Sequence, residues 1–138
     1  MNIYLNFDGD CRSAFEFYRD VFGGDFEVIQ TFGDAPPDAG MPAAVKDRIM
    51  HVSLPVAGSM LMGSDVSEPG SLVAGNNFSI SLSPESRGEC DSLFHRISEG
   101  GEVLMPLEET FWGAYFGCCR DRFGITWMLN HEIQGGAG

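Results

Sequence analysis

The sequence predicts an α+β fold built from two similar βαβββ modules. Residues 3–28 have the pattern of a strand, a turn, an amphipathic helix, Gly-Gly and a strand, and residues 78–103 repeat that order. The first strand of each module alternates apolar and polar residues, the period-two pattern of a half-buried strand. Each helix carries an apolar stripe at helical spacing and precedes a glycine pair. We therefore expect one module used twice, with the working site in a cleft where the copies meet.

Module one covers about residues 1–65. The alternating residues Ile3, Leu5 and Phe7 predict a strand at 2–8, and a helix is expected at 11–22, ending at Gly23-Gly24. Its expected buried stripe consists of Ala14, Phe17, Tyr18 and Val21. Further strands are expected near 25–33, 48–54 and 59–64, with Gly58 in the hairpin turn and an irregular Pro-rich loop at 34–46.

Module two follows a linker at 66–76 and covers about residues 77–132. A strand is expected at 77–83, then a helix at 88–98 with Cys90, Leu93, Phe94 and Ile97 on its apolar side. A strand at 102–106 precedes a closing hairpin, whose turn at 121–124 has the Asp and Gly positions of a type I turn. Residues 133–138 form a tail. A chain of 138 residues is long enough for one globular domain, whereas two independent domains would be too small.

Composition excludes several classes of function. Eight Lys and Arg against twenty Asp and Glu give a net charge of −12, which opposes binding to nucleic acid or to an anionic membrane. The acidity favours solubility and also suits a cationic ligand. No apolar run reaches membrane-spanning length, and no secretory signal is visible, so we expect a cytoplasmic protein with reduced cysteines. The spacing of the four cysteines lacks the paired pattern of a zinc ribbon.

The order of elements and four segments carry a resemblance to a known superfamily. The segments are YLNFDGD (4–10), AFEFYRDVFGG (14–24), RIMHVSL (48–54) and WGAYFGCCRDRFGITWM (112–128). Together they resemble the PhnB-like branch of the vicinal oxygen chelate superfamily, which includes glyoxalase I, extradiol dioxygenases and bleomycin-resistance proteins. The resemblance implies a glyoxalase-like fold, with two curled mixed sheets around a cleft. It also implies a homodimer, because modules in this superfamily often pair across chains.

Members of this branch are often labelled 3-demethylubiquinone 3-methyltransferase, and the residues argue against that activity here. A protein that binds S-adenosylmethionine is expected to have a Gly-rich loop directly after its first strand. Gly23-Gly24 instead follows a predicted helix. We read this pair as a helix stop.

The expected cleft-facing residues do not form the superfamily's metal site. Metal-dependent relatives place His or Glu on the first and last strand of each module. Because strand faces alternate, the predicted inward residues are neutral, and a shift by one residue offers only apolar side chains. Zinc, iron and manganese need several imidazole, carboxylate or thiolate ligands around one point. We therefore expect no metal and no cofactor, with ligand-binding candidates Tyr4, Asn6, Met62, Asn77, Ser79, Met128 and Asn130.

His51 is the one titratable side chain expected on the polar side of its strand. The pattern places Met50, Val52 and Leu54 on the apolar side and Ile49, His51 and Ser53 on the other. One imidazole does not chelate a metal alone. His51 is therefore a candidate hydrogen-bonding or proton-shuttling group for a ligand, or else a strand histidine bonded to a neighbouring polar group.

Aromatic residues cluster in the late hairpin, where Trp112 and Tyr115 are further ligand-binding candidates. The sequence does not decide which of them faces the core and which the cleft. The leading hypothesis is a metal-independent protein that binds a small molecule. The alternatives are an enzyme, either metal-dependent or using His51 as acid or base, and a subunit whose main role is association.

Overall fold

The computed structural model describes residues 1–36, 40 and 42–133. The chain divides into two compact units, Met1–Val73 and Ala74–Gly138, and each is described by itself. The predicted single domain and the cleft between modules stay predictions. The expected tail beyond residue 133 and part of the Pro-rich loop (37–39 and 41) lie outside the described residues. None of the described helices has the length and apolar character needed to cross a membrane.

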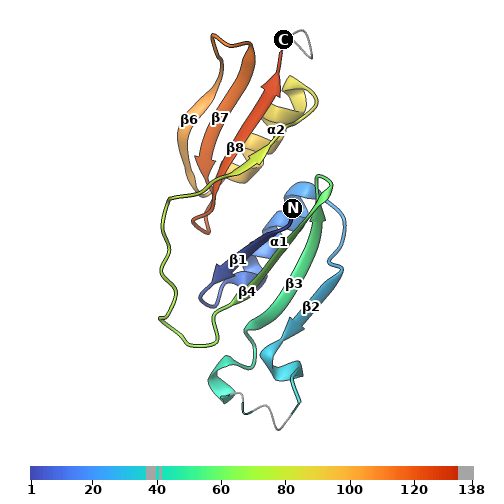
Figure 1. The fold of residues 1–138 in the computed structure, drawn as a ribbon, viewed down its shortest axis with the longest axis vertical. Coiled ribbons are helices and arrows are strands. Elements are labelled where there is room, and N and C mark those ends of the chain that lie inside the picture. Colours follow the sequence, from blue (N-terminus) through green and yellow to red (C-terminus); the bar gives the residue numbers. More distant parts are fainter. Residues whose placement is uncertain (37–39, 41, 134–138) are drawn as a thin grey trace. The chain divides into compact units, whose positions relative to one another are not determined.

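The first unit is a four-stranded mixed sheet with one helix on one face (Figure 1). The strand order is β1-β4-β3-β2; β1 pairs with β4 in parallel, and the other pairs are antiparallel. The elements are β1 (Ile3–Phe7), α1 (Cys11–Phe22), β2 (Val28–Thr31), the 3₁₀ helices η1 (Phe32–Asp34) and η3 (Ala43–Val45), β3 (Ile49–Val56) and β4 (Ser59–Asp65).

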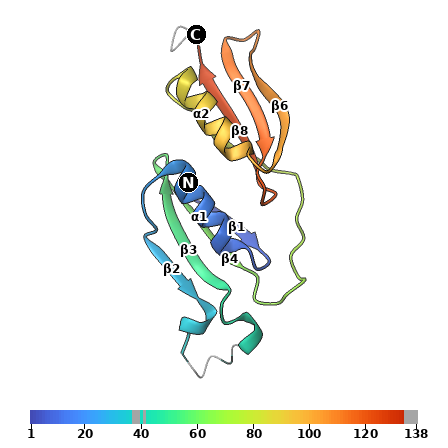
Figure 2. The ribbon, with the colours of Figure 1, turned by 180° about the vertical axis from the view of Figure 1, so that it is seen from behind.

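The second unit repeats this arrangement. Its strand order is β5-β8-β7-β6, again with one parallel pair, β5 with β8. Figure 2 shows α1 and α2 each lying over one face of its own sheet. The elements are β5 (Ile80–Leu82), α2 (Arg87–Ser98), β6 (Glu102–Glu109), β7 (Ala114–Arg120) and β8 (Thr126–Glu132). The α+β class and the duplicated βαβββ order are confirmed, with both sheets open.

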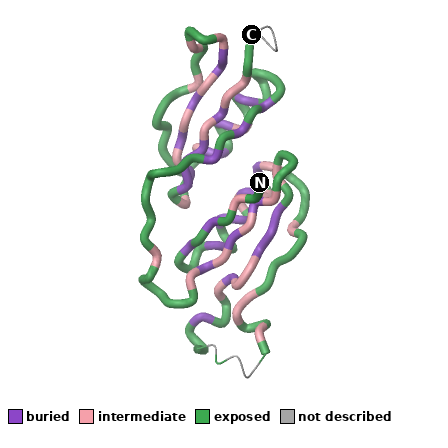
Figure 3. The backbone as a smooth tube through the Cα atoms, viewed as in Figure 1, coloured by how far each residue is buried: buried purple, intermediate pink, exposed green. Residues whose placement is uncertain are grey.

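The core of each unit lies between its sheet and its helix (Figure 3). In α1 the buried stripe includes Phe15, which is fully buried, whereas the predicted Phe17 is only partly buried. A Cβ at Gly63 of β4 would lie 2.6 Å from Cε1 of Phe15, so the ring packs directly on the glycine. The second unit uses the same device, because a Cβ at Gly117 would lie 2.9 Å from Cε2 of Phe94. Both aromatic rings reach the sheet where a strand lacks a side chain.

Two strands differ from the sequence-based prediction. On β3 the pairing with β2 runs from Gln30–His51 to Thr31–Ile49 and skips Met50. This bulge changes the phase of the strand, so Ile49 is fully buried and Met50 only partly, the reverse of the predicted pattern. β5 is shorter than the expected 77–83 and pairs with β8 only over Ile80–Leu82.

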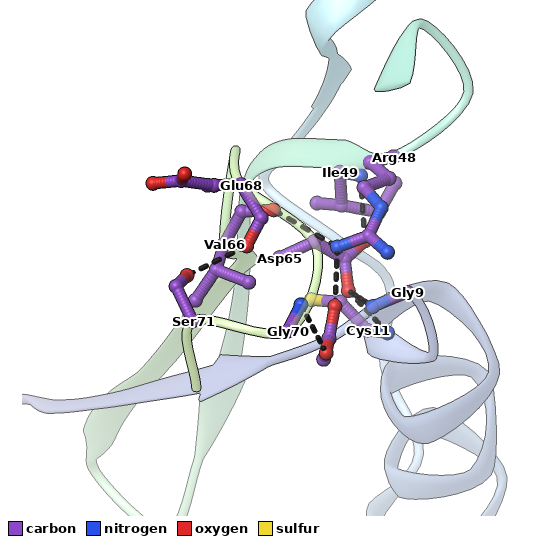
Figure 4. Close-up of polar contacts among 10 residues, drawn as sticks. Gly9, Cys11, Arg48, Ile49, Asp65, Val66, Glu68, Gly70 and Ser71 are labelled. Atoms are coloured by element: carbon purple, nitrogen blue, oxygen red, sulfur yellow. Dashed lines mark hydrogen bonds and ion pairs between the residues drawn. The ribbon is translucent and has the colours of Figure 1, made fainter. Parts of the chain in front are cut away.

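A buried carboxylate joins three elements of the first unit (Figure 4). Asp65, at the end of β4, is 3% exposed. Its Oδ1 accepts hydrogen bonds from the backbone N–H groups of Gly9 (2.7 Å) and Cys11 (3.1 Å), and its Oδ2 accepts from that of Ile49 (2.8 Å). Asp10, the N-cap of α1, makes no side-chain capping bond. Asp65 therefore supplies the acceptor at the start of α1 and also fixes the start of β3.

The start of the connection between the units is fastened to the first unit (Figure 4). Arg48 Nη1 donates to Asp8 Oδ1 (2.7 Å) and to the carbonyl oxygen of Val66 (3.0 Å). Asp8 Oδ2 accepts from the backbone N–H of Gly70 (3.0 Å). The guanidinium and the backbone N–H hold the pKa of Asp8 below its ordinary value. Residues 66–70 thus belong structurally to the first unit.

Candidate functional site

The face of the first sheet opposite α1 carries most of the candidate residues that the structure brings together. Residues directly opposite each other on paired strands share a face, and β4 sets Met62 opposite both Tyr4 of β1 and Ser53 of β3. Their neighbours Leu5, Val52, Leu54 and Leu61 are buried on the helix side. Tyr4, Asn6 and Met62 therefore lie on the open face, as the sequence predicts.

A hollow of about 720 Å³ lies over the β3–β4 hairpin on this face. Its floor is formed by strand side chains and its wall by the hairpin turn, in which Ala57 (φ 51°) and Gly58 (φ 79°) both have the positive φ of a type I′ turn. The lining residues are Asn2, Glu27, His51, Ser53, Pro55, Val56, Ala57, Gly58, Ser59, Met60 and Met62. A hollow of this size is in the range of small-molecule sites.

His51 lies beside Tyr4 at the margin of the hollow. Tyr4 Oη is 3.4 Å from His51 Nδ1, and the two rings stack with centroids 5.8 Å apart and planes 24° from parallel. His51 donates to the phenol oxygen or accepts from it, according to its tautomer. When Nδ1 carries the hydrogen, the lone pair of Nε2 stays available to a ligand. The structure thus joins two candidates that lie forty-seven residues apart in the sequence.

The hollow has little charge. Among its lining residues the ionisable side chains are Glu27 and His51, and neither Lys nor Arg contributes to the wall formed by the described residues. The polar groups are the amide of Asn2 and the hydroxyls of Ser53 and Ser59, while Met60 and Met62 present thioethers. A neutral, partly apolar surface of this kind suits a small organic ligand that has few charges.

Sequence reasoning does not point to Glu27 as a site residue. The apolar residues around it, Phe26, Val28 and Ile29, do not alternate, so the pattern leaves the direction of its side chain open. In the structure the backbone N–H of Glu27 donates to the carbonyl of Ser53 (2.9 Å), which extends the β2–β3 pairing by one residue. This bond holds Glu27 at the edge of the hollow.

The candidates of the second unit are more scattered. Met128 lies opposite Ser81 and Cys118, and Asn130 lies opposite Phe116, all on the open face of the second sheet. Asn77 and Ser79 precede β5 and are exposed outside the strand, contrary to the predicted 77–83 strand. Their expected inward direction therefore does not follow from strand alternation.

The structure decides which face Tyr115 takes. Its ring lies on the helix side of β7, 8% exposed, and its Oη donates to Asp91 Oδ1 of α2 (2.6 Å). The neighbouring carboxylate of Asp91 raises the pKa of Tyr115 above its ordinary value. The guanidinium of Arg87 lies 4.1 Å from the ring centroid. Tyr115 thus joins α2 to the sheet and is not a residue of the open face.

Trp112 lies in the turn between β6 and β7, outside the strands. It is 61% exposed and packs edge-to-face with Phe111, with ring centroids 4.9 Å apart. Phe111 is 97% exposed. Both rings are therefore largely open to solvent within their own unit.

The side chains on the open faces do not match the set of metal ligands expected in metal-dependent relatives. The strand positions that should supply His or Glu instead hold Tyr4, Asn6 and Met62 in the first unit and Met128 and Asn130 in the second. Within the described residues, no three His, Cys, Asp or Glu side chains gather where they could hold an ion. Phenol, amide and thioether groups are poor ligands for zinc, iron or manganese. The expected absence of a metal site stays a prediction.

Comparisons with known proteins agree with the fold. The family model described as "Glyoxalase/Bleomycin resistance protein/Dioxygenase superfamily" matches residues 2–129. Protein YjdN from Escherichia coli (strain K12) is 30% identical over 135 residues, which cover 92% of this chain and 91% of that protein.

Solved structures show the same fold. The crystal structure of protein PA1353 from Pseudomonas aeruginosa is 44% identical in sequence, covers 96% of each chain and has a TM-score of 0.84. A putative 3-demethylubiquinone-9 3-methyltransferase, PhnB protein, from Bacillus cereus is 23% identical with a TM-score of 0.78, covering 95% of this chain and 98% of that one. At that identity the second likeness concerns the fold alone.

Proposed function

Because the chain belongs to the glyoxalase/bleomycin resistance protein/dioxygenase superfamily, we propose that it binds a small molecule in the hollow on the open face of its first sheet. The observation that carries the proposal is the hollow itself, whose side chains are almost all neutral. His51, whose ring stacks on that of Tyr4, supplies a hydrogen-bonding nitrogen to the hollow, and Met60 and Met62 supply an adaptable apolar floor. Binding in this proposal is independent of a divalent metal.

The methyltransferase label of the Bacillus cereus neighbour does not extend to this chain in our proposal. Gly23, which has φ 81°, ends helix α1, and its N–H donates to the carbonyl of Arg19. The glycine pair therefore does not form a loop between a first strand and a helix, the position at which a Gly-rich loop binds a cofactor. The prediction that Gly23-Gly24 is a helix stop is confirmed.

The methyl groups of Met60 and Met62 offer a direct test of the site. We expect small aromatic fragments to shift the NMR signals of these two methyls in protein labelled with ¹³C at its seven methionine methyls. Ser59→Trp, at the rim of the hollow, should abolish these shifts because the indole occupies the entrance. The matched control is Ser13→Trp on the exposed side of α1, which should bind as the unmodified chain does. Equal binding by both variants would place the site elsewhere.

The metal independence of the proposal needs its own measurement. Protein dialysed against zinc, manganese or iron(II) and then against buffer should retain none of these ions in stoichiometric amount, since residues 1–36, 40 and 42–133 offer no suitable ligand set. Fragment binding should be unchanged by a chelator. Retention of one ion per chain would contradict the proposal.

A second candidate function is acid–base catalysis by His51. It is favoured by one observation, the imidazole at the margin of the hollow with Tyr4 Oη near its Nδ1. The test is to incubate the protein with the small-molecule fraction of a cell extract and follow the consumption of compounds by mass spectrometry. If His51 is catalytic, His51→Gln should stop consumption while fragments still bind. If the imidazole is only a hydrogen-bonding group, the variant should change affinity alone.

A further inference from the structure

The charges around the hollow distinguish between classes of ligand. We propose that the ligand carries a positively charged nitrogen attached to an apolar group, an inference that rests on the proposed binding function. The one carboxylate that lines the hollow is Glu27, and the described wall includes neither Lys nor Arg. A cationic nitrogen therefore gains a favourable interaction with Glu27, whereas a carboxylate or phosphate group is repelled by that like charge.

Glu27 is free to face a ligand. Arg48, Arg87 and Arg120 form ion pairs with Asp8, Glu109 and Glu102, and Glu27 takes part in none of these. The backbone of Glu27 is held by its bond to Ser53, while its side chain is exposed at the edge of the hollow. Its carboxylate can thus turn toward a bound cation without breaking an internal ion pair in the part of the chain that the structure describes.

The aromatic pair adds a ring surface beside the hollow, on the side of the sheet away from Glu27. Tyr4 is 47% exposed, and its ring stacks beside His51, which lines the hollow. The face of an exposed phenol ring attracts an ammonium group through its quadrupole. The thioethers of Met60 and Met62 and the ring of Pro55 provide the apolar surface for the rest of the ligand.

The helix N-termini, which are the usual anion-binding elements, are partly occupied by acceptors of the chain itself. At the start of α1, the N–H groups of Gly9 and Cys11 donate to Asp65. At the start of α2, the N–H of Glu89 donates to the hydroxyl of Ser86, and the N–H of Glu85 donates to the carboxylate of Glu89. Each helix start therefore already holds an acceptor of the chain itself, and the carboxylates of Asp65 and Glu89 there disfavour a further anion. The excess of twenty acidic over eight basic residues adds a long-range preference for cations.

The test uses three series of fragments. Each series has one aromatic group, and its members differ in the charge of the group attached to it. Phenyl, naphthyl and indolyl ethyl groups are each presented as the amine, the alcohol and the corresponding carboxylate, and binding is followed through the methyl signals of Met60 and Met62. At low ionic strength we expect the amines to bind about threefold more tightly than the alcohols and about tenfold more tightly than the carboxylates, as an exposed charge pair allows. Added salt should reduce both ratios.

Two variants assign the preference to its source. Glu27→Gln should lower the amine-to-alcohol ratio to about one, because the amide keeps the shape and removes the charge. The matched control, Glu16→Gln on the exposed side of α1, removes one charge away from the hollow and should keep the preference. Equal binding of all charge forms, or an unchanged preference in Glu27→Gln, would overturn this inference and leave the proposed function standing. If no fragment of any series moves the two methyl signals, both fail.

Discussion

At the scale of single residues, the side chain of Asp65 links three segments of the first unit. Its two oxygens accept three backbone hydrogen bonds, which come from the β1–α1 turn, the start of α1 and the start of β3. The backbone donors thus satisfy the hydrogen-bonding capacity of this buried carboxylate without a cationic partner. Its replacement therefore leaves buried N–H groups without an acceptor.

We predict that Asp65→Asn lowers the free energy of unfolding by about 3 kcal/mol. The amide keeps one oxygen, but its NH₂ group must face an N–H donor, either that of Ile49 or those of Gly9 and Cys11. Urea unfolding followed by circular dichroism measures the change. Asp10→Asn is the control, because the side chain of Asp10 makes no capping bond to α1, and its effect should be within about 0.5 kcal/mol. A loss below 1 kcal/mol for Asp65→Asn would show that the three bonds contribute little.

The four thiols differ in reactivity because they differ in burial. Cys11, Cys90 and Cys119 are fully buried, while Cys118 lies on the open face of the second sheet and is partly exposed. Burial raises the pKa of Cys90 to about 11 and that of Cys119 to about 12, and it raises that of Cys11 further. We expect one fast-reacting thiol with a disulfide reagent at pH 8, which Cys118→Ser should remove. Several equally fast thiols in the folded chain would contradict this order.

The raised thiol pKa values also predict how stability depends on pH. The folded state keeps Cys90 protonated up to about pH 11, whereas the unfolded thiol ionises near its ordinary value of about 8.5. The stabilisation is therefore complete below that value and is lost as the pH rises toward 11. Between pH 8.5 and 10 we expect the free energy of unfolding to fall by about 1–2 kcal/mol for each such thiol. Cys90→Ala should show a smaller fall over the same range.

At the scale of elements, the helix of each unit packs an aromatic ring directly on a glycine of its sheet. We predict that Gly63→Ala costs about 1–3 kcal/mol of unfolding free energy, because the added methyl meets the ring of Phe15. Phe15→Leu should relieve part of this cost, so the double variant should lose less than the sum of the two single variants. Gly88→Ala is the control: its methyl has open space in α2, and the change should be neutral or stabilising. Strict additivity would show that ring and glycine are not coupled.

The sequence predicted most elements because each contains a local periodic signal. The alternation of Ile3, Leu5 and Phe7 placed Tyr4 and Asn6 on the opposite face, and the structure agrees. The error at Ile49 and Met50 has a nonlocal cause, because a bulge depends on the neighbouring strand. The choice of Phe17 over Phe15 is similar, since a glycine on β4 decides which ring enters the core.

The candidate site was predicted only in part for the same reason. Tyr4, His51 and Met62 follow from strand phase, and the structure brings them to one face. The face taken by Tyr115 depends on Asp91, a residue of α2 twenty-four positions earlier in the chain. Strand phase therefore located residues on a face, while partners distant in the sequence determined their contacts.

At the scale of the whole molecule, the duplicated units leave four edge strands, β1 and β2 in the first sheet and β5 and β6 in the second. We propose that two copies associate, and we expect light scattering to give a mass near twice the 15.0 kDa of one chain at moderate salt. Because each copy carries a net charge of −12, lower ionic strength should weaken the dimer. A mass of one chain at every salt concentration would contradict this proposal.

The position of Asp65 also has a consequence for the order in which the chain can fold. The central strand β4 and the carboxylate that holds the start of α1 leave the ribosome after all their partners in the first unit. Until then β1 has no parallel neighbour, and the first turn of α1 lacks its acceptor. The nascent first unit therefore acquires its cooperative structure in one late step, once β4 has emerged, and not gradually from β1 onward.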